Sequence, residues 1–263
     1  MTTILLTNDD GIDSPGLAAA AEALLPLGRV VVTAPLHQQT SMGRSYASRP
    51  DAKFEPYPFF VNGQKVEAYS YEGSPAAVVR HALLGMPRLS PALVVAGINY
   101  GENIGINVTG SGTVGATLDA ASRGIPALAM SVETSVEAHR EYVEQDWTGS
   151  IHFTRFFADR ILHKGMPPGA NVLKVEVPAN ANAETPWKPT RLSPFTYYEA
   201  RFEKASLENM RSDMRFTKRD GIGEPADTDA YAIRTGKTVS VTPLMLDLTA
   251  STPFPLLTAW ADD

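Results

Sequence analysis

Short apolar runs alternate with helical segments along residues 4–177, and this alternation restricts the possible folds more than any other feature. Residues 4–7, 30–33 and 92–96 are almost continuously apolar, which is typical of strands buried on both faces. The alanine-rich segment at residues 14–25 opens on a Ser-Pro pair, a combination typical of a helix N-cap and first turn. Strands that alternate with helices predict an α/β fold with a Rossmann-like, mostly parallel sheet and helices on both faces.

The pattern continues to about residue 177 and then changes. We expect strands at about 52–72, helices at 75–84, 113–122 and 146–162, strands at 127–132 and 171–177, and a glycine-rich loop at 97–112. From residue 178 prolines, aromatics and charges mix without a helical period, and residues 239–242 alternate like a strand. The sequence therefore predicts a catalytic core at residues 1–180 and a β-rich C-terminal extension at 181–263 that serves in oligomerisation.

Composition excludes several classes of function. The chain has no cysteine, so a metal must bind oxygen or imidazole ligands rather than thiolates. The net charge of −6 argues against a surface for polymeric nucleic acid. No apolar run approaches the roughly 18 residues of a membrane span, and the first residues lack the basic region of a signal peptide. We therefore expect a cytoplasmic protein that does not bind membranes.

Asp9 and Asp10 are adjacent acids at the point where the first predicted strand ends. Adjacent carboxylates repel each other unless a cation or a proton lies between them, and a hard divalent ion suits such oxygen ligands. The alternative is a simple turn, because the pair Asp10-Gly11 is common in turns. Taken alone, the motif favours the turn.

Two further predicted strands end in oxygen-bearing side chains. Thr40 and Ser41 lie in the loop after residues 30–33, and Asn99 follows residues 92–96. Parallel strands bring their carboxyl ends to one edge of the sheet, where ligands bind, so these residues should converge on Asp9 and Asp10. Two carboxylates, a hydroxyl and an amide suffice for Mg²⁺, which keeps several waters, although each polar loop residue alone could serve only in loop hydrogen bonds.

The segment Gly110-Ser111-Gly112-Thr113 precedes a predicted helix. Free amides at a helix N-terminus form an anion site, so a phosphoryl group fits there, and a capping role for Ser111 or Thr113 is compatible with it. Gly110, Gly112 and Gly115 also satisfy a dinucleotide-binding pattern, but a long loop separates them from the preceding strand. None of the five histidines has metal-site spacing, and His37 alone, in the loop of Thr40, is placed to face a substrate.

Several segments together resemble the SurE family of survival-protein nucleotidases, over most of the chain. They are residues 4–11 with Pro15-Gly16, residues 94–105, Ser111-Gly112-Thr113-Val114, and residues 239–244 with Asp247-Leu248-Thr249. The resemblance implies a divalent cation, magnesium or manganese, one per subunit, and removal of phosphate from 5′ or 3′ nucleoside monophosphates. It also implies a homodimer or homotetramer in which C-terminal segments reach across subunits.

Carried over by position, the resemblance implies the site residues. Asp9, Asp10 and Asn99 match the family's metal ligands. Thr40 occupies the place of the family's serine ligand, with Ser41 as the alternative hydroxyl, where the family usually has Ser-Gly. The substrate-binding residues implied in this way are Asn103, Ser111, Gly112 and Thr113. The family often has an acid in place of Ala77 and a glycine in place of Asp227, so the preferred base is not predicted.

These observations lead to one hypothesis and two alternatives. We expect a phosphomonoesterase in which a metal-activated water attacks phosphorus, with Asp9 and Asp10 as the catalytic acids. In a second reading Asp9 is a covalent nucleophile, but the chain lacks the spaced Asp-x-Asp arrangement that usually accompanies it. In a third, the chain is a nucleotide-binding regulatory module without catalysis that uses the glycines at 110–115.

Overall fold

The computed structural model describes all residues except 1, 136–141, 143, 236 and 262–263. The strands are β1 (Thr3–Thr7), β2 (Arg29–Pro35), β3 (Glu55–Pro56), β4 (Phe59–Val61), β5 (Gln64–Tyr71), β6 (Leu93–Tyr100), β7 (Ala127–Val132), β8 (Val172–Val177), β9 (Trp187–Pro189), β10 (Tyr198–Arg201), β11 (Arg215–Lys218) and β12 (Val239–Leu244). The helices are α1 (Pro15–Leu24), α2 (Pro75–Gly85), α3 (Gly112–Ala121), α4 (Thr148–Lys164), α5 (Asp229–Arg234) and α6 (Phe254–Ala261), with short 3₁₀ helices at Leu25–Leu27, Ile106–Gly110 and Arg211–Asp213.

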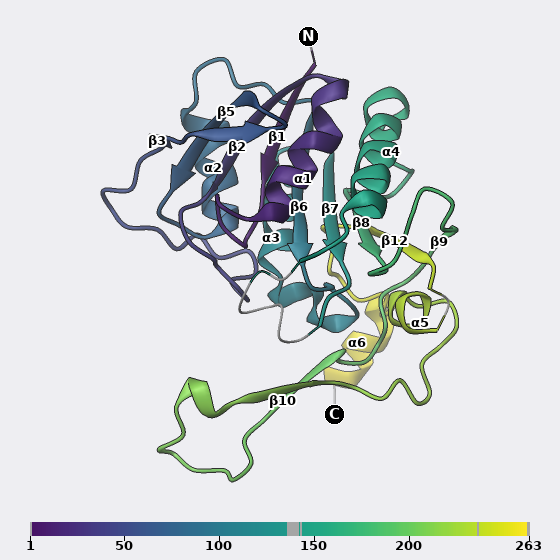
Figure 1. Cartoon of the computed structure of the whole chain (residues 1–263). Coiled ribbons are helices and arrows are strands. Elements are labelled where there is room, and N and C mark those ends of the chain that lie inside the picture. Colours follow the sequence, from purple (N-terminus) through teal and green to yellow (C-terminus); the bar gives the residue numbers. More distant parts are fainter. Residues whose placement is uncertain (1, 136–141, 143, 236, 262–263) are drawn as a thin grey trace.

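One mixed sheet forms the centre of the molecule (Figure 1). Strands β5, β2, β1, β6, β7 and β8 lie side by side in that order and run parallel. Helices cover both faces, with a separate cluster of buried apolar residues on each side. The four central strands are buried along almost their whole length, which explains their continuous apolar sequence. The predicted fold class is confirmed.

The strand order places a crevice at the ends of β1 and β6. The chain passes from β1 to β2 on one side, whereas β6 lies on the other side of β1 and leads to β7. Loops that follow β1 and β6 therefore leave the sheet in opposite directions, and such a reversal is where ligands bind in open α/β sheets. The predicted site residues lie at this edge.

The C-terminal segment contributes both to this sheet and to structure outside it. Strand β12 lies between β8 and β9, antiparallel to the first and parallel to the second. Strands β10 and β11 form a separate two-stranded sheet that projects from the main body (Figure 1). The alternation at residues 239–242 is thus confirmed as a strand, while the sheet crosses the boundary drawn at residue 180.

Two details differ from the expectations. The loop predicted from Gly97 begins only after Tyr100, because β6 continues through a bulge between Ala96 and Asn99. Gly97, at φ 135°, lies so close to the Met130 carbonyl that a side chain would not fit, and glycine here serves the strand rather than a turn. Helices α5 and α6 were not expected in a β-rich segment. No helix in the described ranges is both long and apolar enough to cross a membrane.

Candidate metal centre

Asp9 lies at the carboxyl end of β1 and faces the N-terminus of α3. The Thr113 hydroxyl donates a hydrogen bond to the Asp9 carboxylate, and the backbone amides of Gly112 and Thr113 also hydrogen-bond to it. Gly112 permits this approach, since a Cβ at that position would lie 2.8 Å from the Asp9 Cβ. The positive end of the helix therefore fixes and stabilises the carboxylate.

Asp10 is held by groups from three other segments. The Tyr100 amide at the end of β6 donates to Asp10 Oδ2 over 3.0 Å, and the Gln38 side chain approaches Oδ1 at 3.5 Å. The Tyr142 hydroxyl donates to the Asp10 carbonyl over 2.8 Å, and its ring packs on Tyr100 with centroids 5.2 Å apart. Strand β6 and the loop of Gln38 thus bind the Asp10 carboxylate, and Tyr142 binds its backbone.

The turn that sequence analysis favoured is also present. The Asn8 side chain accepts from the Gly11 amide at 3.3 Å and donates to the Gly11 carbonyl at 2.8 Å. Gly11 has φ 104°, a conformation that costs glycine little. The turn and the acidic pair therefore coexist, because Asn8 closes the turn and leaves both aspartates for other contacts.

The two aspartates are buried and lack a compensating cation. Their exposure is 7% and 4%. Burial raises the pKa of Asp9 to about 6, against the hydrogen bonds from Thr113 and nearby amides. Burial and the charge of Asp9 raise the pKa of Asp10 to about 8. Within the described ranges no lysine, arginine or histidine forms an ion pair with either acid, so a positive charge is missing.

Asn99 and Thr40 each lie next to a residue whose backbone amide binds one of the two aspartates. Asn99 is buried at the end of β6, one residue before the amide that binds Asp10, and its side chain donates to the Gly101 carbonyl over 2.5 Å. Thr40 is exposed and follows Gln39, whose amide donates to the Asp9 carbonyl over 2.7 Å. Neither side chain contacts the carboxylates directly, so the roles of Asn99 and Thr40 as ligands stay predictions.

The backbone conformation of Ser41 helps to decide whether Thr40 or Ser41 occupies the place of the family's serine ligand. Ser41 has φ 63°, in the left-handed region that favours glycine. Residue 41 therefore has a backbone conformation that glycine adopts readily, as expected at the place of the glycine in the Ser-Gly pair. This observation favours Thr40 over Ser41 as the residue in the hydroxyl position.

The predicted substrate-binding residues divide into two groups. Ser111 caps α3, since its hydroxyl accepts from the Val114 amide over 3.1 Å, and it lies beside Gly112 and Thr113 at Asp9. Asn103 is directed elsewhere: its side chain donates to the Ser131 hydroxyl over 3.0 Å, and its carbonyl accepts from the buried Lys174 over 2.8 Å. The loop that carries Asn103 is thereby pinned to β7 and β8.

Sequence reasoning missed three contributors to the site. Gln38 lies in the same polar loop as Thr40 and has no distinguishing pattern, and the Tyr100 contribution is a backbone amide that no side-chain pattern can reveal. Tyr142 lies 132 residues from Asp10 in a segment without periodic sequence, so no sequence signal pointed to it.

The donor set fits a hard divalent cation of the magnesium or manganese type. It combines two buried carboxylates that need a positive charge, a buried amide and a nearby hydroxyl, all oxygen-bearing. Among the described residues, no histidine, aspartate or glutamate joins Asp9 and Asp10 to form a group of three possible metal ligands. A site with few protein ligands suits Mg²⁺ in particular, which retains several waters.

Comparisons with known proteins find relatives over nearly the whole chain. The family model described as survival protein SurE matches residues 4–199. A 5′-nucleotidase SurE of Methanocella arvoryzae is 36% identical over 94% of this chain and 93% of its own, and one of Archaeoglobus fulgidus is 37% identical over 98% and 97%. The crystal structure of the SurE protein from Aquifex aeolicus superposes with a TM-score of 0.77 at 28% identity, covering 99% of this chain and 100% of the other.

Proposed function

Because this chain belongs to the SurE family, we propose that it is a nucleotidase that removes phosphate from nucleoside 5′-monophosphates with the help of a divalent cation. Relatives that share more than a third of its residues over nearly the full length are named 5′-nucleotidases. The observation that carries the metal dependence is the buried pair Asp9 and Asp10, which has no cation among the described residues.

Asp9, Asp10, Asn99 and Thr40 would hold the cation. When bound, it supplies positive charge for the phosphate oxygens and lowers the pKa of water. The chain's own groups prepare this chemistry, since Thr113 and the amides of α3 fix Asp9 while the Tyr100 amide fixes Asp10. Neither carboxylate must reorganise during the reaction, which is the main contribution of a preorganised site.

Phosphate binding is assigned to the start of α3. Ser111, Gly112 and Thr113 lie at the positive end of the helix, where the helix dipole stabilises an anion. The same turn binds Asp9, so phosphate and carboxylate share one electropositive element. Asn103 would contribute through its loop, which Lys174, Glu176 and Asp229 hold in place, because its own side chain donates to Ser131. Phosphoryl transfer needs chiefly this positioning and charge stabilisation.

Phosphate release from a panel of nucleoside 5′- and 3′-monophosphates tests the proposal. The panel is run with Mg²⁺, with Mn²⁺ and with EDTA. We expect release from 5′-monophosphates with either metal and none with EDTA, while the 3′ arm determines whether both positions are accepted. Binding of nucleotides without release in any metal arm would instead identify a regulatory binding module.

We also propose that the chain forms a homodimer or homotetramer through its C-terminal segment. Helix α6 exposes four large apolar side chains by 53% to 79%, namely Phe254, Leu256, Leu257 and Trp260. Strands β10 and β11 project from the body (Figure 1), and Phe216 in β11 and Phe202 just after β10 are also exposed. Large exposed apolar surface marks protein interfaces.

A further inference from the structure

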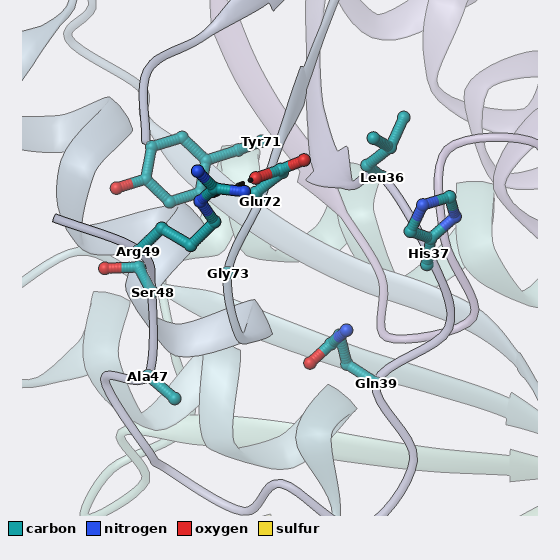
Figure 2. A pocket seen from close by; sticks show the side chains of 9 residues that line it. All are labelled: Leu36, His37, Gln39, Ala47, Ser48, Arg49, Tyr71, Glu72 and Gly73. Atoms are coloured by element: carbon teal, nitrogen blue, oxygen red, sulfur yellow. Dashed lines mark ion pairs between the residues drawn. The ribbon is translucent and has the colours of Figure 1, made fainter. Parts of the chain in front are cut away.

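A cavity of about 400 Å³ opens at the same edge of the sheet as the candidate metal centre. Figure 2 shows its walls, which come from the loops after β2 and β5 and from the segment at residues 47–49. Its volume lies in the range of pockets that bind small ligands. The residues that line it are Leu36, His37, Gln39, Ala47, Ser48, Arg49, Tyr71, Glu72 and Gly73.

Residues 37–39 link this cavity to the acidic pair. The Gln39 amide donates to the Asp9 carbonyl over 2.7 Å, and the site where a Gly11 Cβ would lie is 3.3 Å from the backbone of His37 and of Gln38. The backbone of this loop therefore packs on the metal centre. The side chains of His37 and Gln39 line the cavity on the other side (Figure 2).

The floor of the cavity is rigid and aromatic. Tyr71 is 2% exposed and lies between Phe54 and His81, with ring centroids 4.9 Å and 5.0 Å away. A side chain fixed on two sides keeps its position when a ligand enters, so little ordering entropy is lost on binding. Leu36 adds apolar surface at the far wall (Figure 2).

The charges at the mouth favour a neutral polar ligand over an anion. Arg49 pairs with Asp51 at 3.0 Å and with Glu72 at 3.5 Å, so two carboxylates already offset its charge. A phosphate would meet net negative charge here, whereas hydroxyl and amino groups would find acceptors on Glu72. Gln39 and Ser48 add an amide and a hydroxyl that both donate and accept.

The other described cavity, of about 360 Å³, does not offer these features. It lies along β5 and its hairpin, between Pro56 and Tyr69, and contains no residue from the loops after β1, β2 or β6. None of its lining residues contacts Asp9 or Asp10. The cavity behind residues 37–39 is therefore the one that adjoins the site of phosphate chemistry.

We propose that this cavity binds the nucleoside part of the substrate while the phosphate lies at Asp9 and Asp10. The inference rests on the proposed nucleotidase function and adds the residues that recognise the base and ribose. Gln39, next to the acidic pair, hydrogen-bonds to the ribose, and Ser48 and Glu72 hydrogen-bond to the base. The metal centre and α3 hold the anionic end, and the neutral end occupies the cavity.

A Ser48→Trp variant tests this by filling the cavity from an exposed position. For each enzyme we compare kcat/KM for the four common ribonucleoside 5′-monophosphates with kcat/KM for p-nitrophenyl phosphate, which has no nucleoside. We expect the ratio of the two constants to fall at least about tenfold in Ser48→Trp. The matched control is Ser206→Trp, at an exposed residue outside the cavity, which should keep the wild-type ratio.

A Gln39→Ala variant provides a second measure without added bulk, because it removes the side-chain amide and keeps the backbone bond to Asp9. Its ratio should fall by severalfold. Unchanged ratios in both variants, or equal losses on both substrates at an unchanged melting temperature, would overturn the subsite.

If wild-type enzyme releases no phosphate from any substrate, the proposed function fails and calorimetry decides the subsite alone. Adenosine, guanosine, cytidine and uridine are titrated into wild type and Ser48→Trp in EDTA. Binding of a nucleoside that Ser48→Trp abolishes supports the subsite. Absence of binding to wild type refutes it.

Discussion

Asp9 and Asp10 are under opposing influences that explain both their burial and their expected ligand. Hydrogen bonds from Thr113 and the α3 amides favour the ionised form of Asp9, while burial favours the protonated form. Asp10 experiences burial and the neighbouring charge together. A divalent cation would satisfy both acids at once, because it replaces the missing positive charge without a protein side chain.

Replacing Asp9 with Asn should abolish turnover without loss of the fold. Asn preserves the shape of the side chain and can still accept from Thr113, but it removes the charge that the cation needs. We expect kcat to fall at least about a hundredfold, measured as phosphate release with saturating Mn²⁺. The far-ultraviolet circular dichroism and melting temperature serve as the control, and a near-normal rate would refute the assignment.

The pH dependence of stability follows from the same pair. The pKa values of Asp9 and Asp10 are raised in the folded protein, to about 6 and about 8 from an ordinary value of 3.8. The folded state therefore binds more protons than the unfolded state between about pH 4 and pH 8, and the free energy of unfolding of metal-free protein should fall as pH rises through this window.

Thermal melts in EDTA at pH 5.5 and pH 8.5 measure this effect. We expect a lower melting temperature at pH 8.5 and a larger rise on adding Mn²⁺ at that pH, because less proton release accompanies binding. An Asp9→Asn, Asp10→Asn double variant should flatten the pH slope. An equal slope in the double variant would show that other groups produce it.

At the residue scale, sequence can locate side chains that follow the ends of predicted strands. The positions of Asp9, Asp10 and Asn99 follow from strand ends, which apolar runs locate well. The contribution of Tyr100 was out of reach, since it is a backbone amide whose direction depends on the bulge in β6. Tyr142 was out of reach because its contact with Asp10 spans 132 residues.

At the scale of elements, the start of α3 packs against both the candidate metal centre and the loop that carries Thr40. Gly112 allows Asp9 to approach the first turn, and a Cβ on Gly115 would overlap the Gly43 carbonyl oxygen. The loop that carries Thr40 thus packs directly on the helix. Gly112, which sequence analysis assigned to phosphate binding, thus also serves close packing, as Gly115 does, and a glycine pattern alone does not distinguish the two roles.

A Gly112→Ala variant should weaken metal binding. The added Cβ would lie 2.8 Å from both the Cβ and Oδ2 of Asp9, which forces the carboxylate out of position. We expect the Mn²⁺ dissociation constant to rise about tenfold, or about 1.4 kcal/mol, in a calorimetric titration.

The matched control is Gly85→Ala. Gly85 ends α2 and has open space where a Cβ would lie. This variant should leave Mn²⁺ affinity unchanged and should be at least as stable as wild type, because alanine is the better helix former. Equal affinity in both variants would show that Gly112 does not position Asp9.

The two short helices of the C-terminal segment, α5 and α6, could not be predicted from the hydrophobic pattern of the sequence. Helix α5 has six residues and begins at an N-cap, Thr228, whose hydroxyl accepts from the Tyr231 amide. So short a helix shows no clear period. Helix α6 is apolar around much of its surface and exposed, so its sequence lacks the amphipathic pattern of a surface helix.

At the scale of the whole molecule, the parallel sheet was predictable because consecutive strands and helices repeat a local pattern. The position of β12 was not, since its pairing with β8 joins segments more than 60 residues apart. Buried ion pairs also link the C-terminal segment to β8. Lys174 of β8 pairs with Asp229 of α5 at 3.0 Å and with its strand neighbour Glu176 at 3.2 Å. The C-terminal segment is thus part of the structure that holds the loop of Asn103.

Removing residues 252–263 should reduce oligomerisation. The deletion removes α6 and its exposed apolar side chains but leaves β12 and the sheet intact. Multi-angle light scattering should show a smaller assembly than the full chain at the same concentration, because the apolar contact surface is gone. An unchanged mass would assign subunit contact to another surface, such as the projecting β10–β11 sheet.

The central claim is that Asp9 and Asp10 hold one divalent cation on which phosphate release depends. Electron paramagnetic resonance counts bound Mn²⁺ in wild type and in the Asp9→Asn, Asp10→Asn double variant, while phosphate release from a nucleoside 5′-monophosphate is followed in the same samples. We predict one Mn²⁺ per wild-type chain, with activity rising in proportion to occupancy, and loss of both in the variant. Mn²⁺ binding and phosphate release that persist in the variant would contradict the account.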